Sequence, residues 1–348
     1  MTLATTYSAA LCLAIFSLLC LGSWANSLKL AGRWRFELFY FDFSFGLAAT
    51  SLVLAMTAGS FGYDSFTFLD DVMRASKHSL AYAFGAGLIF NLGNMLLIAG
   101  MSLVGMSIAF PIGLGIAIIV GALVAHAVSS QGNPVLVFTG VAVVLVAVLV
   151  CAFGYRSLAL LREFERMKAG QHRTLRPSVP WKGVFLSAGG GIVLGSFTPV
   201  LDIARDPDIG LGPYSLGVMF CMGIAFSTIL YNMYFMNLPV KGQPVEILAY
   251  FHGTIREHLY GVLGGAVWSL GTVAALVLSS SPKETMPGPA LSYALAQSSP
   301  LLAAIWGLVV WKESRGADAK VTALMGLMLF LLAAGLTMLA IAPLYASI

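Results

Sequence analysis

The stretch Gly87-Leu88-Ile89-Phe90-Asn91-Leu92-Gly93-Asn94 has a counterpart in the second half of the chain, Gly265-Ala266-Val267-Trp268-Ser269-Leu270-Gly271-Thr272. Both stretches place polar residues at matching positions, and both lie inside a long apolar run. A duplicated set of apolar helices explains this pattern, because duplication repeats both the sequence and its place within an element.

Two shorter stretches repeat in the same order along the chain. Leu21-Gly22-Ser23-Trp24 returns as Leu194-Gly195-Ser196-Phe197, and 119–124 returns as 305–310. The offset between counterparts grows from 173 to 178 and then to 186 residues, as insertions in connecting loops would produce. The repeat therefore extends over most of the chain.

Composition places the chain in a membrane. Of its 348 residues, 59% are hydrophobic and only 10% are charged, whereas a soluble domain carries about 25% charged residues. So much apolar surface cannot be hidden from water, which excludes a soluble domain. The formal net charge of +4 comes from short connectors and does not point to nucleic acid as a partner.

Ten apolar runs are long enough to cross a bilayer, which takes roughly 20 residues each. We expect membrane helices at about 5–28, 37–60, 79–100, 102–126, 134–154, 183–204, 213–235, 259–280, 288–311 and 321–344. The first run lacks a basic leading region, so we expect it to remain in the mature protein. The break between the third and fourth runs, near Met101, is short and predicts a tight hairpin.

The longest connector divides the runs into two groups of five. The predicted organisation is a first repeat at 1–154, a basic connector at 155–182 and a second repeat at 183–348. Because each repeat has an odd number of helices, the second must enter the membrane from the opposite side, so the repeats are inverted. Within the connector, 162–168 reads as a short amphipathic helix on the membrane surface.

Positive charge predicts the orientation of the chain. Connectors that follow odd-numbered helices hold all but four of the 19 Lys and Arg residues, the exceptions being Arg74, Lys77, Arg205 and Lys283. Cytoplasmic loops carry the excess of Lys and Arg. We therefore expect both termini outside and the 155–182 connector in the cytoplasm.

Three acidic residues lie within apolar runs, where a charge is costly and a function is the default hypothesis. Glu37 and Asp42 are the candidates for proton coupling. For Glu37 the alternative is a charge near a helix start, paired with Arg33 or Arg35. For Asp42, which lies among aromatic residues, the alternative is a structural hydrogen bond to a neighbouring helix.

Charge clusters are predicted on opposite faces of the membrane. Arg33 and Arg35 lie on one face, and Asp202 with Arg205 lies on the other. These four residues are candidates for gates that lock alternately. Ordinary ion pairs at the membrane surface are the alternative.

Polar and aromatic residues within the helices are candidates for binding a small solute, which needs a flat apolar wall and a few oriented polar groups. The candidates are Trp24, Asn26, Phe90, Asn91, Asn94, Trp268, Ser269, Thr272 and Gln297. Tyr231 and Asn232 are further candidates. The alternative for the polar members is hydrogen bonding between helices. Gln297 precedes Pro300, which frees a backbone carbonyl, and kinked helices are where transporters place their sites.

Other motifs point to packing and not to chemistry. The run 188–191, Ala-Gly-Gly-Gly, follows no strand and precedes no Lys-Ser/Thr pair, so we expect close helix packing there, as at Gly85, Gly87, Gly113 and Gly115. Neither the four cysteines nor His126, His252 and His258 have metal-ligand spacing. The sequence also has no nucleophile elbow, no His-Glu-x-x-His and no catalytic acidic pair. We expect no enzyme activity, no metal and no cofactor.

The sequence resembles a known group of transporters. Ten helices arranged as five plus five inverted resemble the drug/metabolite transporter superfamily. Four stretches, 22–24, 34–42, 91–94 and 102–113, resemble sugar porters and ureide permeases of its glucose/ribose porter and ureide permease branch. The resemblance implies transport of a solute from a central cavity, often with protons, and leaves the solute open among sugars, ureides, nucleobases and amines.

We therefore expect an all-α secondary transporter that works by alternating access in the bacterial inner membrane. Its solute is small and polar, sugar-like or ureide/nucleobase-like, and its other partners are protons and lipid. Trp24, Phe90 and Trp268 would supply the aromatic walls. The chain would act as a monomer or homodimer. The alternatives are an exporter of amphipathic drugs or metabolites and a membrane enzyme or assembly subunit; a channel is disfavoured because no filter-like loop is visible.

Overall fold

The computed structural model describes residues 2–32, 34–61, 67–129, 132–168, 181–205 and 209–345. Every regular element among these residues is helical. In chain order they are α1 (Tyr7–Ser23), α2 (Asn26–Leu30), α3 (Phe36–Met56), α4 (Phe68–Arg74), α5 (Lys77–Val104), α6 (Met106–Ser129), α7 (Pro134–Lys168), α8 (Lys182–Ile203), α9 (Pro213–Asn237), η1 (Ile247–His252), α10 (Ile255–Ser279), η2 (Lys283–Thr285), α11 (Pro289–Gln297), α12 (Ser299–Ile305), η3 (Trp306–Val310), α13 (Ala319–Ile341) and η4 (Ala342–Tyr345).

The predicted membrane helices are confirmed. Within the described ranges, nine helical spans are long and apolar enough to cross a bilayer, and α1 with α2 counts as one of them. A broken pair, 290–297 with 299–310, makes a tenth span if its two parts are counted together. The interruption falls two residues before Pro300, whose ring lacks the N–H that a continuous helix would need. The chain is a multi-pass, all-α membrane protein.

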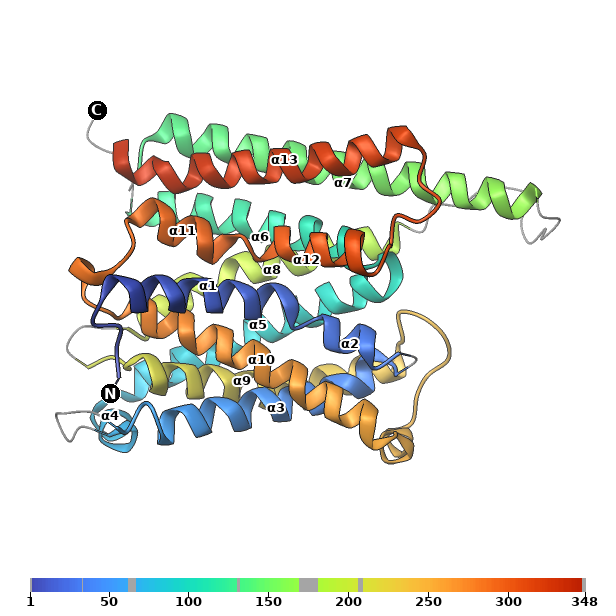
Figure 1. Cartoon of the computed structure of the whole chain (residues 1–348). Helices are drawn as coiled ribbons and strands as arrows, with labels where there is room; N and C mark the ends of the chain where they lie inside the picture. Colours follow the sequence, from blue (N-terminus) through green and yellow to red (C-terminus); the bar gives the residue numbers. More distant parts are fainter. Residues whose placement is uncertain are drawn as a thin grey trace. The chain divides into compact units, whose positions relative to one another are not determined.

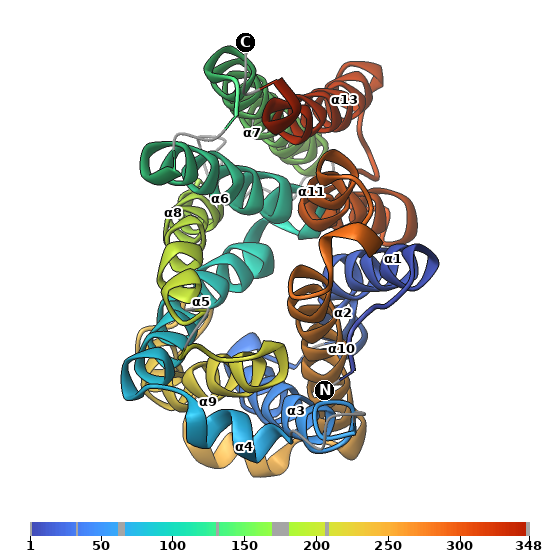
Figure 2. The ribbon, with the colours of Figure 1, turned by 90° about the vertical axis from the view of Figure 1, so that its left-hand side faces the viewer.

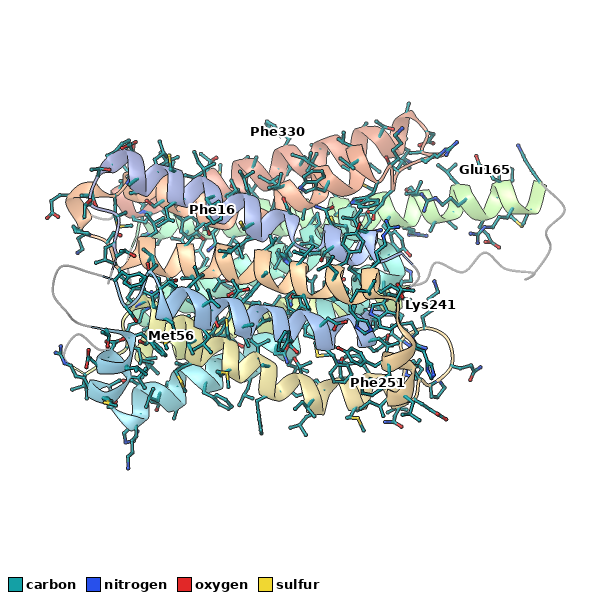
Figure 3. The ribbon with its side chains drawn as sticks, turned by 60° about the horizontal axis from the view of Figure 1, so that its bottom comes forward. Phe16, Met56, Glu165, Lys241, Phe251 and Phe330 are labelled. Atoms are coloured by element: carbon teal, nitrogen blue, oxygen red, sulfur yellow. The ribbon has the colours of Figure 1, made fainter. Side chains whose placement is uncertain are left out.

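Two helix boundaries differ from the prediction for clear physical reasons. α5 ends at Val104 and not near Met101, because Gly105 adopts φ +89°, a left-handed conformation that stops a helix. The N–H groups of Met106 and Ser107, which open α6, then donate to the carboxylate of Glu313 at 2.9 and 2.7 Å. α7 continues to Lys168, so the predicted surface helix at 162–168 is the end of α7, on which Glu165 lies (Figure 3).

The chain forms two compact units, and each takes residues from both halves of the sequence. Unit 1 comprises residues 1–95 and 196–299, and unit 2 comprises 96–195 and 300–348. α5 and α8 therefore contribute to both units. A compact unit is not the same as a sequence repeat, so the two inverted repeats, 1–154 and 183–348, and the connector 155–182 remain predictions.

Unit 1 is built on α3, α9 and α10, which gather as a group in the end-on view (Figure 2). α3 and α10 lie close because a Cβ atom at Gly46 would overlap the Val262 carbonyl oxygen, and one at Gly265 would overlap that of Phe43. α9 runs antiparallel to α3, since Phe36 packs on Phe235 at one end while Gly59 lies against Tyr214 at the other.

Within unit 1, α5 runs beside α9 in the same direction. A Cβ atom at Gly87 would overlap the carbonyl oxygen of Phe220, and one at Gly223 would overlap that of Phe84. Four residues later on α5, Asn91 contacts the following turn of α9 at Ile224. This alignment of the two helices places the polar residues of α5 against α9.

Unit 2 is centred on α7 and α13, which lie side by side along their length (Figure 1). Gly140 of α7 lies against Leu339, and Gly335 of α13 lies against Val144. The core of this unit includes Ile112, Met325 and Met328, all nearly inaccessible to solvent. The glycines predicted to allow close packing do so at Gly113, Gly115 and Gly191, whereas Gly189 faces open space.

Candidate functional site

Aromatic rings from α3, α5, α8, α9 and α10, together with Trp24 between α1 and α2, meet in unit 1 and form an aromatic cluster. Its members are Trp24, Phe43, Phe90, Phe197, Phe220 and Trp268. The Phe90 ring lies 5.0 Å from Trp268, 5.2 Å from Phe197 and 5.4 Å from Phe220, as measured between ring centroids. Trp24 joins this group through Phe43, at 4.8 Å. The structure thus brings the three predicted aromatic walls into one continuous apolar surface.

Asn91 is the polar residue next to Phe90 on α5, and it is fully buried. Its amide nitrogen lies 3.0 Å from the carbonyl oxygen of Ile224, 2.8 Å from Ser227 Oγ and 3.1 Å from Thr228 Oγ1, all on α9. Its amide oxygen, Oδ1, has no hydrogen-bond partner. The nitrogen therefore serves helix packing, the alternative noted for these residues, while the oxygen is left free to accept a bond.

Asn94 lies almost one turn further along α5 and donates through Nδ2 to the Tyr40 hydroxyl of α3 at 2.8 Å. On α9 the corresponding turn carries Asn232, four residues beyond Thr228. Asn232 is fully buried, and neither its amide nitrogen nor its amide oxygen has a partner. Unpaired buried amides are costly and need an explanation. Asn91, Asn94 and Asn232 thus place polar groups on successive turns of two adjacent helices.

The remaining solute candidates are more scattered. Ser269 is fully buried on α10 beside Trp268, and Thr272 is half-buried one turn later. Asn26 opens α2 and donates to the backbone carbonyl of Ser23 at 2.9 Å, so its amide is used locally. Gln297 is half-buried at the last position of α11.

The first of the two coupling candidates, Glu37, is held by a permanent positive charge. Its carboxylate accepts from Arg35 Nη2 at 2.6 Å and from Arg35 Nε at 3.2 Å, a bidentate pair. The Glu37 side chain is 2% exposed, against 27% for Arg35. Arg35 also donates to the Gln243 carbonyl oxygen at 2.6 Å, which ties the start of α3 to the connector after α9. Arg33, the other predicted partner, lies outside the described residues.

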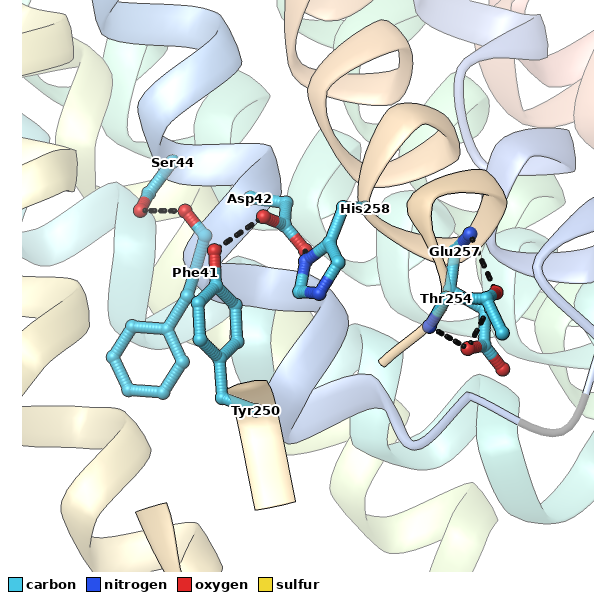
Figure 4. Close-up of polar contacts among 7 residues, drawn as sticks. All are labelled: Phe41, Asp42, Ser44, Tyr250, Thr254, Glu257 and His258. Carbon is cyan, nitrogen blue, oxygen red and sulfur yellow. Dashed lines mark hydrogen bonds and ion pairs between the residues drawn. The ribbon is translucent and has the colours of Figure 1, made fainter. Parts of the chain in front are cut away.

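The second candidate, Asp42, has two titratable partners (Figure 4). Its Oδ1 accepts from the Tyr250 hydroxyl of η1 at 2.5 Å, and its Oδ2 lies 2.9 Å from Nδ1 of His258 on α10. Gly261 allows this approach, because a Cβ atom there would overlap the Asp42 side chain. Burial first, and then the adjoining Asp42 carboxylate, raise the pKa of Tyr250. The phenol therefore keeps its proton and acts as a donor.

Sequence reasoning missed His258 and Tyr250. The predicted membrane run, 259–280, begins one residue after His258 and leaves it outside the helix. A usable signal was present: Thr254 and Glu257 form a capping box, in which each side chain binds the backbone N–H of the other. That motif starts α10 at Ile255 and puts His258 in its first turn, four residues before Val262, which packs on α3. No sequence pattern pointed to Tyr250.

The predicted charge cluster at Asp202 is a surface pair. Asp202 Oδ1 lies 3.6 Å from Arg205 Nη1, and the Asp202 side chain is 58% exposed. This pair lies near the start of α9, because Leu211 N donates to the Ala204 carbonyl oxygen. Glu37 and Arg35 lie at the other end of α9. The two charge pairs therefore occupy opposite ends of unit 1.

Across the described ranges, no group of three or more His, Cys, Asp or Glu side chains is placed to hold a metal ion. All four cysteines are free thiols.

Comparison with known proteins agrees with this architecture. Residues 39–176 match the family model described as Ureide permease. The chain is 23% identical to Ureide permease 2 of Arabidopsis thaliana over 91% of this chain and 92% of that protein. It is 22% identical to Ureide permease 4 over 93% and 94%, and 21% identical to Ureide permease 1 over 91% and 92%, both from the same plant.

The prediction of a membrane transporter is confirmed by this similarity, which extends over nearly the whole chain. The chain resembles permeases and not enzymes. The resemblance to ureide permeases is confirmed as well, whereas no comparison bears on the wider superfamily or on its sugar-porter members.

Proposed function

We propose that this chain is a secondary transporter that moves a small polar solute of the ureide or nucleobase type across a membrane by alternating access. The observation that carries the proposal is the set of unpaired amide atoms on Asn91, which adjoins Phe90 of the aromatic cluster, and on Asn232, further along α9. A cyclic ureide or nucleobase presents a flat ring together with N–H and C=O groups on its edge. The ring would stack on Phe90 and Trp268, while its edge would pair with the free amide atoms.

A sugar remains a second solute class within the same scheme, since aromatic walls and amides also bind hydroxyl-bearing rings. The ureide class is favoured because the relatives that match nearly the whole chain are named ureide permeases. The wider assignment to the drug/metabolite transporter superfamily and its glucose/ribose porter branch stays part of this proposal.

Orientation and coupling complete the proposal. The distribution of Lys and Arg favours both termini outside and the 155–182 connector in the cytoplasm. The membrane in this proposal is the bacterial inner membrane. Transport would draw on a proton gradient through Glu37 or Asp42. Two charge groups at opposite ends of unit 1 would stabilise alternate closed states. One is Arg35, to which Arg33 would add, and the other is Asp202 with Arg205. The chain would work as a monomer or homodimer.

The test of the function is ligand stabilisation followed by uptake. Purified protein is heated with allantoin, uracil, glucose or a lipophilic cation, each in large excess. A ligand at 100 times its dissociation constant stabilises by about 2.7 kcal/mol, which raises the unfolding temperature measurably. We expect a rise with allantoin or uracil, and uptake of the same compound into proteoliposomes. A rise with lipophilic cations alone would instead support an exporter, and no rise with any compound would contradict a solute site.

Asn232→Leu separates a binding role from a structural one. Replacing a buried amide that has no partner by an apolar side chain of similar size is neutral or stabilising. We therefore expect the ligand-free variant to unfold at the same or a higher temperature, while its affinity for the solute falls by about tenfold, the loss of one hydrogen bond. The matched control is Asn237→Leu, at the exposed end of α9, which should leave affinity unchanged. If Asn232→Leu binds the solute as tightly as the parent protein, Asn232 is not part of the site.

A further inference from the structure

Unit 1 contains two buried carboxylates near the start of α3, and their partners differ in kind. Glu37 is paired with a guanidinium, which stays charged at every physiological pH. Asp42 is paired with an imidazole and a phenol. Imidazole is the side chain that gains and loses a proton between about pH 5 and 8. Only the second group can change its charge in the range where a membrane proton gradient operates.

We infer that Asp42, His258 and Tyr250 form the proton-binding centre of this transporter, that the proton is carried at His258 Nε2, and that the Glu37 carboxylate, paired with Arg35, carries no proton. The inference rests on the proposed function, because a proton-binding centre has a role here only if solute transport uses it.

The geometry defines where the proton goes. His258 Nδ1 faces the Asp42 carboxylate at 2.9 Å, so in the neutral imidazole this nitrogen carries the hydrogen and Nε2 keeps its lone pair. A proton arriving from water binds that lone pair and no other bond breaks. The three-residue centre then changes from a net charge of minus one to zero. Release of the same proton from Nε2 restores the first state.

The centre has access to one end of unit 1. Asp42 lies six residues into α3, about 9 Å along a helix that rises 1.5 Å per residue. His258 lies in the first turn of α10, at the same end, and its side chain is 23% exposed. Gly253 lies against Nε2: a Cβ atom there would be 2.7 Å from it and would also overlap the Trp34 ring. A residue without a side chain at 253 therefore leaves room for the imidazole edge that carries Nε2.

Few other charges act on this centre. α1 and α9 carry no acidic, basic or histidine residue, and α2 carries only Lys29. On α3 the only other charge is Glu37, already neutralised by Arg35. On α10 the neighbours are Arg256 and Glu257, and the Glu257 carboxylate accepts hydrogen bonds from Thr254. His252 of η1 is exposed. Protonation of His258 is therefore the main way in which the net charge of this part of unit 1 can change.

Tyr250 connects the centre to the segment between α9 and α10. Its hydroxyl bridges η1 to Asp42, while the outward side chains of η1, such as Phe251, which is 74% exposed, point away from the unit (Figure 3). A carboxylate with a net negative charge binds a phenol donor more strongly than one already paired with an imidazolium. Proton binding at His258 thus weakens the contact that keeps η1 docked on α3.

The transport test uses the full chain in proteoliposomes with radiolabelled allantoin and uracil as probes. Exchange of labelled for unlabelled solute at equal pH reports solute binding and movement alone, whereas accumulation against a gradient reports coupling. We expect His258→Gln and Asp42→Asn to keep exchange and to lose pH-driven accumulation, ending at equal concentrations inside and outside. His252→Gln, the matched control, and Glu37→Gln should still accumulate the probe. Accumulation by His258→Gln, or its loss in Glu37→Gln alone, would overturn the inference.

A second readout does not depend on any solute. The Trp34 ring lies 5.3 Å from His258, close enough for an imidazolium to quench indole fluorescence. We expect fluorescence to fall when lowering the pH adds a proton to this imidazole. The fall should be absent in His258→Gln and in Trp34→Phe, and present in His252→Gln. Equal pH curves for the parent protein and His258→Gln would overturn the inference. If the parent protein transports neither allantoin nor uracil but shows the expected pH dependence of fluorescence, the proposed function is refuted and the proton site stands.

Discussion

Arg35→Ala should destabilise the protein more than any other single change to a charged residue of unit 1. The variant leaves the Glu37 carboxylate, 2% exposed, without its bidentate partner. Breaking a buried ion pair by removing one member costs about 3–5 kcal/mol, because a charge remains buried without compensation. It also removes the bond from Arg35 to the Gln243 carbonyl oxygen. The measurement is the unfolding temperature of the detergent-purified protein, followed by fluorescence-detected size exclusion.

The double variant Arg35→Ala, Glu37→Gln tests the cause. It carries the same cavity as the single variant but no buried charge, so we expect it to recover a large part of the lost stability. Glu37→Gln alone should cost less than Arg35→Ala, because Arg35 is partly exposed and water solvates its charge. If the single Arg35 variant and the double variant unfold at the same temperature, the loss comes from packing or from Gln243, and the buried charge is not its cause.

The membrane helices could be predicted from the sequence because their signal is local. Apolar runs of the right length match the nine spans found among the described residues and the broken pair just before Pro300. The ends of the helices were harder to predict. The end of α5 depends on the left-handed conformation of Gly105 and on a carboxylate, Glu313, that lies more than 200 residues away. Contacts of that separation leave no periodic trace in the sequence.

The candidate site was predictable in its residue types and only partly in its pairings. Polar residues in an apolar run are conspicuous, so the sequence alone points to Asn91, Asn94, Glu37 and Asp42. The pairing of Glu37 with Arg35, two residues away, is the alternative that the sequence offers for Glu37, whereas nothing local says that Asp42 meets His258. The second pairing depends on how α10 is placed against α3, and that placement depends on Gly261 and its neighbours.

Gly87→Ala should also have a large effect, although it adds a single methyl group. A Cβ atom at Gly87 would overlap the Phe220 carbonyl oxygen, a backbone atom of α9 that cannot move without shifting the helix. Overpacking of this kind costs typically about 1–3 kcal/mol, and sometimes more. Separation of α5 from α9 would also break the bonds from Asn91 to Ile224 and Thr228. We expect a lower unfolding temperature together with weaker solute binding.

Gly85→Ala is the matched control on the same helix, two residues away. Both glycines were expected to allow close packing, yet a Cβ atom at Gly85 meets nothing within 4 Å. Alanine favours a helix over glycine by about 1 kcal/mol, so this variant should be as stable as the parent protein or more so. Opposite shifts in unfolding temperature for the two variants would show that the α5–α9 approach, and not helix propensity, sets the cost. Equal losses would mean that α5 packs against α9 through a different face.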